Sequence, residues 1–289
     1  MKKAPHRHFM SNTYPPPEHM LRDLSIEVIT TGTNRARIQA PVVPETCSEK
    51  GFMYVGLLAT LVDVLGGVIA IPAVSPDWIS TSNLSIHTTR HVVPGRVLAE
   101  GTVLRSGRTS IVIGVEIQAQ RTGLPNRTTP AGFAVITYSR LAGNKTGLRL
   151  KTRGNAHEAE RFSLKGEGLH IPFMDKAGIQ ILDRATGRLL LKMDDYVRNS
   201  LGSLQGGMTA FLADLAGQYV ARKGREYPAQ TRDLVIHYMS PGIAGPFQTT
   251  ADVLRMDRHA ALTRIHVVDQ GVDQRLMAMV LNTVGFSDA

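Results

Sequence analysis

Two aspartates are the only charged residues in two long apolar stretches of the chain. Asp63 lies within residues 54–74 and Asp214 within residues 206–221, and apolar residues fill most of the other positions in both stretches. A helix that is apolar on all sides is a buried helix. Burying a carboxylate is costly unless it is paired, hydrogen-bonded or protonated. Each aspartate therefore either has structural partners or acts in chemistry as a base or a nucleophile.

The surroundings of the two aspartates repeat along the chain. Asp63 follows Gly56 by seven residues, as Asp214 follows Gly207, and the two aspartates are 151 positions apart. Downstream, at a spacing of 150, T-S-N-L-S-I-H from Thr81 matches T-R-D-L-V-I-H from position 231, and ten of forty positions are identical. This pattern indicates the duplication of a whole domain, because its period is too long for a solenoid.

The second copy carries the more specific motif. From Asn199 it reads N-x-x-G-x-x-Q-G-G, followed by Asp214 and then by T-x-D-L-x-I-x-Y-M-S-P from Thr231. These residues resemble the hotdog-fold acyl-CoA thioesterases of the phenylacetate-pathway (PaaI) type. The family pattern has His-Gly-Gly where this chain has Gln205 before its two glycines. In the first copy the resemblance is weaker, since Ser48 replaces Asn199 and Tyr54-Val55-Gly56 replaces the Gln-Gly-Gly triplet.

The resemblance implies an α+β architecture with two hotdog domains in tandem, paired within the chain as a pseudo-dimer. In each domain a curled antiparallel sheet wraps one long buried helix. Hairpins are expected to turn at Thr31-Gly32 and Thr186-Gly187, before helices that begin near Val55 and Gly206. The expected divisions are a flexible N-terminal arm (1–19), hotdog 1 (20–142), a basic linker (143–169) and hotdog 2 (170–289).

The same resemblance implies how a site would be assembled. Gly207 and Asp214 share a helix face but lie ~10.5 Å apart along the axis, so one thioester carbonyl cannot touch both. Hotdog dimers place two such helices antiparallel, so the aspartate of one repeat would meet the helix N-terminus of the other. There the amides of Gly206 and Gly207 would polarise the carbonyl. Asn199 and Gln205 either add side-chain donors or cap the helix.

Further residues have two readings each. Two threonines at the start of the repeated strands, Thr81 and Thr231, either place the attacking water or are ordinary strand residues. Four arginines at strand ends either bind the phosphates of coenzyme A or are solvated. They are Arg105, Arg108, Arg255 and Arg258. The repeated His87 and His237 are read as structural.

The two composite sites are expected to differ. Asp214 would face the altered loop of the first repeat, where Ser48, Tyr54 and Val55 replace the motif residues and Tyr54 would occupy the place of the carbonyl. Asp63 would face the intact loop of the second repeat. The sequence thus predicts one dominant site, with Asp63 as its carboxylate.

Composition excludes several other classes. The 289 residues, 43% hydrophobic and 20% charged, suit a two-domain globular protein, and the single cysteine, Cys47, excludes an intrachain disulfide. We expect no metal and no cofactor, coenzyme A being part of the substrate. The net charge of +9 is dispersed and aromatics are only 6%, so nucleic acid is not an expected partner. Asp63, Gly66-Gly67 and Pro72 argue against a membrane span in residues 55–74. A cytoplasmic location is expected, and two chains pairing into a four-hotdog assembly is compatible with the sequence.

The leading function is hydrolysis of acyl-CoA thioesters, with the carboxylate acting as a base toward water or attacking the carbonyl to give a mixed anhydride. A non-catalytic acyl-CoA-binding module is the alternative, because Gln205 departs from the family's histidine. A hotdog hydratase is a third, but the Asp and His dyad of such enzymes is not evident in the sequence.

Overall fold

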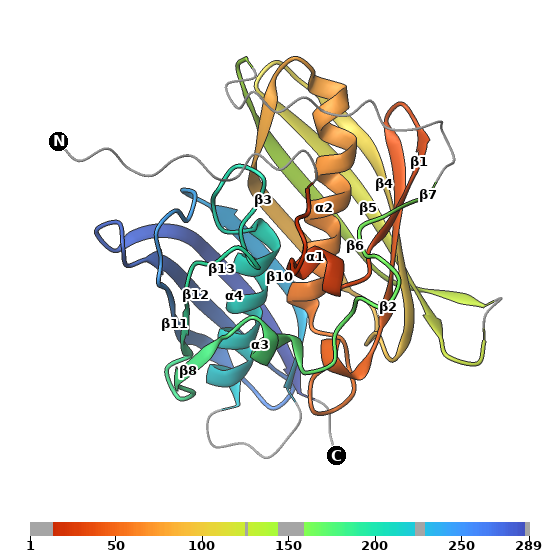
Figure 1. Cartoon of the computed structure of the whole chain (residues 1–289). Helices are drawn as coiled ribbons and strands as arrows, with labels where there is room; N and C mark the ends of the chain where they lie inside the picture. The colour runs from red at the N-terminus through yellow and green to blue at the C-terminus, as the bar shows by residue number, and fades with distance from the viewer. Residues whose placement is uncertain (1–13, 125–126, 144–158, 223–228, 287–289) are drawn as a thin grey trace.

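The computed structural model describes residues 14–124, 127–143, 159–222 and 229–286. Its strands form one 13-stranded antiparallel sheet in the order β7-β1-β2-β4-β5-β6-β3-β10-β13-β12-β11-β9-β8. The sheet curls around two long helices, α2 and α4, which lie side by side on its inner face (Figure 1). After β7, which lies between the repeats in sequence, the next six strands of this order belong to the first repeat and the last six to the second, so the fold is α+β with two hotdogs in tandem, as predicted.

Each repeat has a short helix, a hairpin, a long helix and four strands. The first contains α1 (Met20–Asp23), β1 (Glu27–Gly32), β2 (Arg35–Val42), a 3-10 turn (Pro44–Thr46), α2 (Val55–Val74), β3 (Trp78–Thr88), β4 (Gly95–Ser106), β5 (Ser110–Arg121) and β6 (Thr128–Leu141). Strand β7 (Ala159–Arg161) follows. The second contains α3 (Phe173–Lys176), β8 (Gln180–Asp183), β9 (Arg188–Leu191), α4 (Gly206–Ala221), β10 (Ala229–Tyr238), β11 (Phe247–Met256), β12 (Ala260–Asp269) and β13 (Arg275–Phe286).

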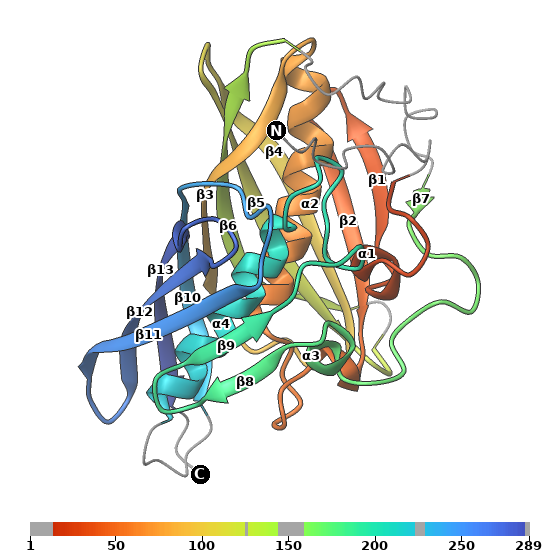
Figure 2. The same ribbon diagram turned by 60° about the vertical axis from the view of Figure 1, so that its left-hand side comes forward.

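The two long helices run antiparallel and approach closely through glycines. A Cβ on Gly56 would overlap the backbone of Phe211, and one on Gly207 would overlap the Thr60 side chain. Glycine at both positions therefore lets the N-terminus of each helix reach the middle of the other. Figure 2 shows this crossing from the side. Helix α2 is long and apolar enough to span a bilayer, yet 67% of its most apolar window is buried inside the protein.

The repeats join at the β3–β10 pair, where the registration is symmetric. Ser85 lies opposite Val235, its own equivalent in the other repeat, so a pseudo-twofold axis passes between them. On either side of that axis, His87 Nδ1 lies 2.7 Å from Asp233 Oδ1, and Asn83 Nδ2 lies 2.9 Å from His237 Nδ1. Both histidines thus connect the two halves of the sheet, consistent with the structural reading.

Several sequence expectations can be compared with the observed elements. Helices α2 and α4 begin at Val55 and Gly206, as expected, and the turn between β8 and β9 includes Thr186-Gly187. The first hairpin turns at residues 33–34, two residues later than expected, because β1 extends through Gly32.

Two expected loose segments are partly ordered. Residues 1–13 of the expected N-terminal arm lie outside the described residues, but His19, at the end of the arm, contacts Arg198 of the second repeat. Most of the expected linker also lies outside the described residues, but Ala159–Arg161 forms β7, which pairs with β1 at the edge of the sheet. The arm and the linker each contribute to the packed fold at one end.

Candidate active site

Asp63 lies in the middle of α2 and faces the N-terminus of α4. Its Oδ1 accepts a hydrogen bond of 2.8 Å from the Thr81 hydroxyl, and its carboxylate also accepts one from the Gly207 N–H. A Cβ on Gly206 would lie 2.8 Å from Oδ2, so only glycine leaves room there for the carboxylate. Only 9% of Asp63 is exposed, and burial raises its pKa to about 6, against the lowering effect of its two hydrogen bonds.

The N-terminus of α4 presents further donors beside Asp63. Gln205 is the N-cap residue, and its own N–H bonds to the Val197 carbonyl at 2.9 Å. Its side chain is 7% exposed and has no hydrogen-bond partner among the described residues. The N–H of Gly206, the first helical residue, has no intrahelical acceptor and none elsewhere in the described chain. An amide side chain and a backbone N–H at the positive end of a helix dipole thus remain unused next to a carboxylate.

Two tyrosine hydroxyls hold the helices around this site. Tyr138 donates to the Asp63 carbonyl at 2.7 Å, and Tyr238 donates to the Gly206 carbonyl at 3.0 Å. One bond fixes α2 and the other fixes the first turn of α4. These two hydrogen bonds from the sheet therefore fix the position of the Asp63 carboxylate relative to that turn.

Asn199 organises the loop that leads into α4. Its Oδ1 accepts from the N–H groups of Leu201 and Ser203 at 2.9 and 3.1 Å, and its Nδ2 donates to the Ser203 hydroxyl at 2.9 Å. Both ends of the side chain are therefore engaged within the loop. The side chain therefore shapes the loop, and in the described contacts it neither caps α4 nor keeps a free donor for a substrate.

Asp214 occupies the equivalent place on α4 but in different surroundings. It is fully buried and accepts from the Thr231 hydroxyl, from Gln218 Nε2 at 2.9 Å and from the Gly56 N–H at 2.7 Å. The Val55 N–H is a further donor. Burial raises the pKa of Asp214, and these four hydrogen bonds oppose that rise. The carboxylate thus accepts hydrogen bonds from both N–H groups at the start of α2, those of Val55 and Gly56.

A small cavity lies beside Gln218, the residue that donates to Asp214. Tyr54 packs edge-on against Phe211, with ring centroids 5.3 Å apart, and borders a cavity of only about 30 Å³. Arg222 of α4 lies 3.8 Å from Glu49 at the same cavity. The loop containing Ser48 has the same form as the loop of Asn199, since Cys47 bridges to Met53 as Arg198 bridges to Leu204. The two loops are equivalent in shape and differ in their side chains.

The four predicted arginines do not gather at either aspartate in the described contacts. Arg105 and Arg108 are exposed at the β4–β5 turn, and Arg255 and Arg258 are exposed at the β11–β12 turn. Arg258 Nε lies 2.7 Å from Nε2 of its neighbour His259. Their exposure leaves a role in phosphate binding as a prediction.

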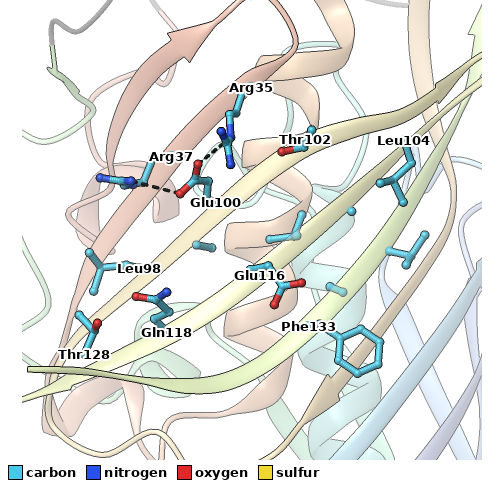
Figure 3. A pocket seen from close by; sticks show the side chains of 15 residues that line it. Arg35, Arg37, Leu98, Glu100, Thr102, Leu104, Glu116, Gln118, Thr128 and Phe133 are labelled. Atoms are coloured by element: carbon cyan, nitrogen blue, oxygen red, sulfur yellow. Dashed lines mark hydrogen bonds and ion pairs between the residues drawn. The ribbon is translucent and has the colours of Figure 1, made fainter.

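A larger hollow of the described surface lies away from both aspartates. A groove of about 600 Å³ runs over the outer face of the first repeat's sheet, on the opposite side from α2 (Figure 3). Arg35 and Arg37 both pair there with Glu100, at 2.7 and 3.1 Å, so the two guanidinium groups share one carboxylate. The groove contains none of the candidate site residues.

Sequence reasoning missed three contributors to these sites. Gln218 lies four residues after Asp214 on the same helix face, where the first repeat has Gly67, so the duplication contained that signal. Tyr14 and His19 approach the Asn199 loop from the N-terminal arm. No spacing in the sequence connects them with residues about 180 positions away.

Comparison with known proteins fits this geometry. Residues 50–125, which contain α2 and Asp63, match the family model of the thioesterase superfamily. A Saccharolobus solfataricus protein named "Putative esterase SSO2140" is 27% identical over 101 residues, covering 35% of this chain and 72% of that protein.

Two solved structures share the fold over nearly the whole chain. The tesB protein MAP1729c of Mycobacterium avium subsp. paratuberculosis has a TM-score of 0.62 at 11% identity, covering 90% of this chain and 96% of its own. The acyl-CoA thioesterase II TesB2 of Mycobacterium marinum has a TM-score of 0.57 at 14% identity, covering 91% and 96%. These likenesses show that the chain has the tandem hotdog fold, and residues 50–125 resemble the thioesterase superfamily. A preference of the PaaI type stays a prediction.

Proposed function

We propose that the protein hydrolyses acyl-CoA thioesters at the site formed by Asp63 of α2 and the N-terminus of α4. The observation that carries the proposal is the Asp63 carboxylate, which lies against a helix N-terminus whose Gln205 side chain and Gly206 N–H have no described acceptor. A carbonyl oxygen placed at those donors would put its carbon near the carboxylate. Acyl transfer requires this combination of a base and an oxyanion site.

Each residue then has a defined step. Asp63 takes a proton from water as the resulting hydroxide adds to the thioester carbon, and the developing oxyanion accepts hydrogen bonds from Gln205 Nε2 and the Gly206 N–H. Collapse of the tetrahedral intermediate breaks the C–S bond. The proton held by Asp63 passes to the leaving thiolate, which restores the carboxylate and releases the acid and free coenzyme A.

The environment of Asp63 suits a general base at neutral pH. Burial raises its pKa to about 6, so the group is ionised at pH 7 yet basic enough to accept a proton from an attacking water. The Thr81 hydroxyl and the Gly207 N–H fix the orientation of the carboxylate, and this assigns Gly207 to Asp63 rather than to the carbonyl.

Coenzyme A as the carrier is the finer part of the proposal. The net charge of +9 and the exposed arginines at the two equivalent turns suit the phosphates of that carrier. The name of the Mycobacterium marinum neighbour, an acyl-CoA thioesterase II, supports the same substrate class.

Release of free thiol from a panel of short, long and aromatic acyl-CoAs tests the proposal. We expect steady-state turnover with at least one acyl group, and its loss in Asp63→Asn. Saturable binding of acyl-CoA without thiol release would favour the alternative of a ligand-binding hotdog protein, for which the departure of Gln205 from the family's histidine is the specific indication.

A further inference from the structure

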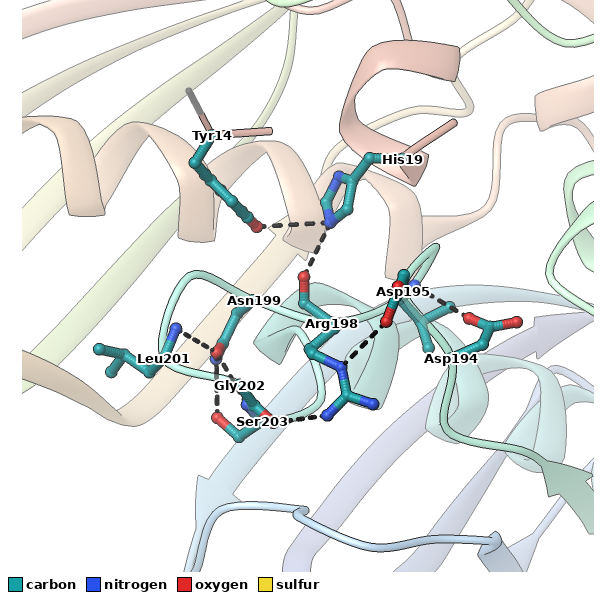
Figure 4. A network of polar contacts seen from close by, with 10 residues as sticks. Tyr14, His19, Asp194, Asp195, Arg198, Asn199, Leu201, Gly202 and Ser203 are labelled. Carbon is teal, nitrogen blue, oxygen red and sulfur yellow. Dashed lines mark hydrogen bonds and ion pairs between the residues drawn. The ribbon is translucent and has the colours of Figure 1, made fainter. Parts of the chain in front are cut away.

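The N-terminal segment preceding β1 contacts the loop that leads into α4. Met20 N–H bonds to the Tyr196 carbonyl at 3.1 Å, and both Met20 and Leu21 are buried. Figure 4 shows Tyr14 and His19 reaching the loop of residues 194–203 from this segment. Because that loop belongs to the second repeat, the start of the chain supports a site element of the opposite half.

His19 makes the central contact. It is fully buried, its Nδ1 accepts the Leu21 N–H at 3.2 Å, and its Nε2 lies 2.9 Å from the Arg198 carbonyl. An Nδ1 that accepts requires the proton of the neutral ring to be on Nε2, so Nε2 donates to the carbonyl. Burial lowers the pKa of His19 to about 4, which keeps the ring neutral around pH 7.

The Arg198 carbonyl is connected through backbone hydrogen bonds to the part of the loop that carries the Gln205 side chain and the Gly206 N–H. Arg198 forms a β-bridge with Leu204, and the next residue, Gln205, bonds through its N–H to the Val197 carbonyl at 2.9 Å. Fixing residues 197–198 therefore fixes the backbone at 204–205, from which the Gln205 side chain and the Gly206 N–H project. Loss of the His19 contact would release this backbone without removing any group of the site.

Tyr14 extends the same network toward Asp63. Its hydroxyl lies 3.5 Å from His19 Nε2. Its ring packs edge-on against His19, with ring centroids 5.2 Å apart. Burial, followed by the negative charge of Asp63, raises the pKa of Tyr14.

The other repeat supplies an internal comparison. Helix α3 precedes β8 by the same spacing as α1 precedes β1, so its N-cap residue Pro172 is the counterpart of His19. Proline has no side-chain donor, and Pro172 makes no side-chain cap hydrogen bond. The loop of the Asp214 site therefore has no equivalent of the His19 contact from this position.

We propose that His19 is a positioning residue, which holds the Gln205 and Gly206 donors in register with Asp63 through the Arg198 carbonyl. This inference rests on the proposed hydrolysis at Asp63. The N-terminal segment is then a third component of the active site, in addition to α2 and α4.

Two substitutions in the full-length chain separate the two hydrogen bonds of His19. His19→Gln places an amide N–H near the position of Nε2 and can still donate to Arg198. His19→Asn places an oxygen near the position of Nδ1 and still caps α1, but it does not reach Arg198. We expect His19→Asn to lower kcat about 10- to 100-fold with KM within about threefold of the parent, because small displacements of catalytic donors carry losses of this size. His19→Gln should restore most of kcat.

Amide hydrogen exchange provides a readout that is independent of activity. Exchange in residues 197–206 should become faster in His19→Asn and stay near the parent rate in His19→Gln, while both proteins keep similar melting temperatures. Equal losses of kcat that follow the melting temperatures would reduce His19 to a structural residue and overturn the proposal, as would a loosened loop with unchanged kcat. Absence of thiol release by the parent enzyme would refute the proposed function itself, and the exchange rates would still decide whether His19 holds the loop.

Discussion

The carboxylates of Asp63 and Asp214 occupy equivalent positions in the two repeats and meet equivalent helix N-termini with different results. Asp214 is fully buried and saturated by four donors, including both free N–H groups of α2. Asp63 accepts from two donors and leaves the Gly206 N–H available. The two carboxylates therefore differ in the number of hydrogen bonds they accept: Asp214 caps a helix, whereas Asp63 is a candidate base.

Residues around the aspartates reinforce this difference. Gln218 donates to Asp214, whereas its counterpart Gly67 has no side chain to offer Asp63. Tyr54 narrows the space beside Asp214, whereas Gln205 brings an unpaired amide to Asp63. Gln218 and Tyr54 therefore occupy space beside Asp214, whereas the side of Asp63 keeps polar groups that a ligand could contact.

The largest expected effect comes from exchanging the two carboxylates separately. Asp63→Asn should lower kcat about 10²- to 10⁴-fold, because a positioned base contributes a factor of this size. Asp214→Asn should keep kcat within about tenfold but lower the melting temperature, since its amide nitrogen would face hydrogen-bond donors. Thiol-release kinetics and thermal unfolding of both variants measure this contrast. The reverse ranking would assign the chemistry to the Asp214 site.

Gln205 should have the next largest effect. Removing one oxyanion donor costs about 2.7–4 kcal/mol in well-studied enzymes, so Gln205→Ala should lower kcat about 10²- to 10³-fold. Gln218→Ala is the matched control, because it removes an amide that serves Asp214. We expect this control to lower stability and leave kcat within about threefold. Similar kcat values for Gln205→Ala and the parent would exclude the side chain as a donor.

The raised pKa of Asp63 predicts linked effects of pH on activity and stability. Since the base must be ionised, kcat/KM should rise with pH and level off above an apparent pKa of about 6. Because the pKa in the folded state lies above the ordinary value of 3.8, the carboxyl favours folding below about pH 4, and this contribution is lost as pH rises through 6.

A pH series of unfolding experiments checks the sign. Between pH 4 and 8, the stability of Asp63→Asn relative to the parent should increase by on the order of 3 kcal/mol, since the variant has no carboxyl to ionise. A constant difference between the two proteins across this range would show that Asp63 is not buried as an ionised group.

The smallest effect is expected at the exposed turns. If the arginines contact coenzyme A phosphates, Arg108→Ala or Arg258→Ala should raise KM a few-fold with kcat unchanged, and added salt should raise KM in the parent enzyme. KM values unaffected by both changes would assign these arginines to the solvated surface. A difference between the two variants would show which turn lies at the mouth of the active site.

The features that could be predicted from the sequence are those that follow from the internal repeat and from the apolar stretches. The matched apolar stretches around Asp63 and Asp214 marked the core helices, and the resemblance of the Asn199 motif supplied the hotdog topology, which periodicity alone does not contain. Which carboxylate faces which loop followed from antiparallel helices. These predictions depend on local patterns and on one symmetry operation.

The rest depends on contacts that close only in three dimensions. His19 and Arg198 are 179 residues apart, and the docking of α1 depends on the packing of Met20 and Leu21 rather than on a motif. The assignment of the Gly207 N–H to Asp63 also could not be read from spacing, because it depends on the depth at which Thr60 and Gly207 let the helices approach.

The symmetric register of β3 and β10 bears on how the sequences of the two repeats can diverge during evolution. In a pair of identical chains, any substitution near the axis or in a site loop appears twice, so a residue that blocks one pocket blocks both. Here Asp233 faces His87 while Asn83 faces His237, and Tyr54 is present in only one loop. In a fused chain each half can change alone, so the loop of one repeat can lose its donors while the loop of the other keeps them.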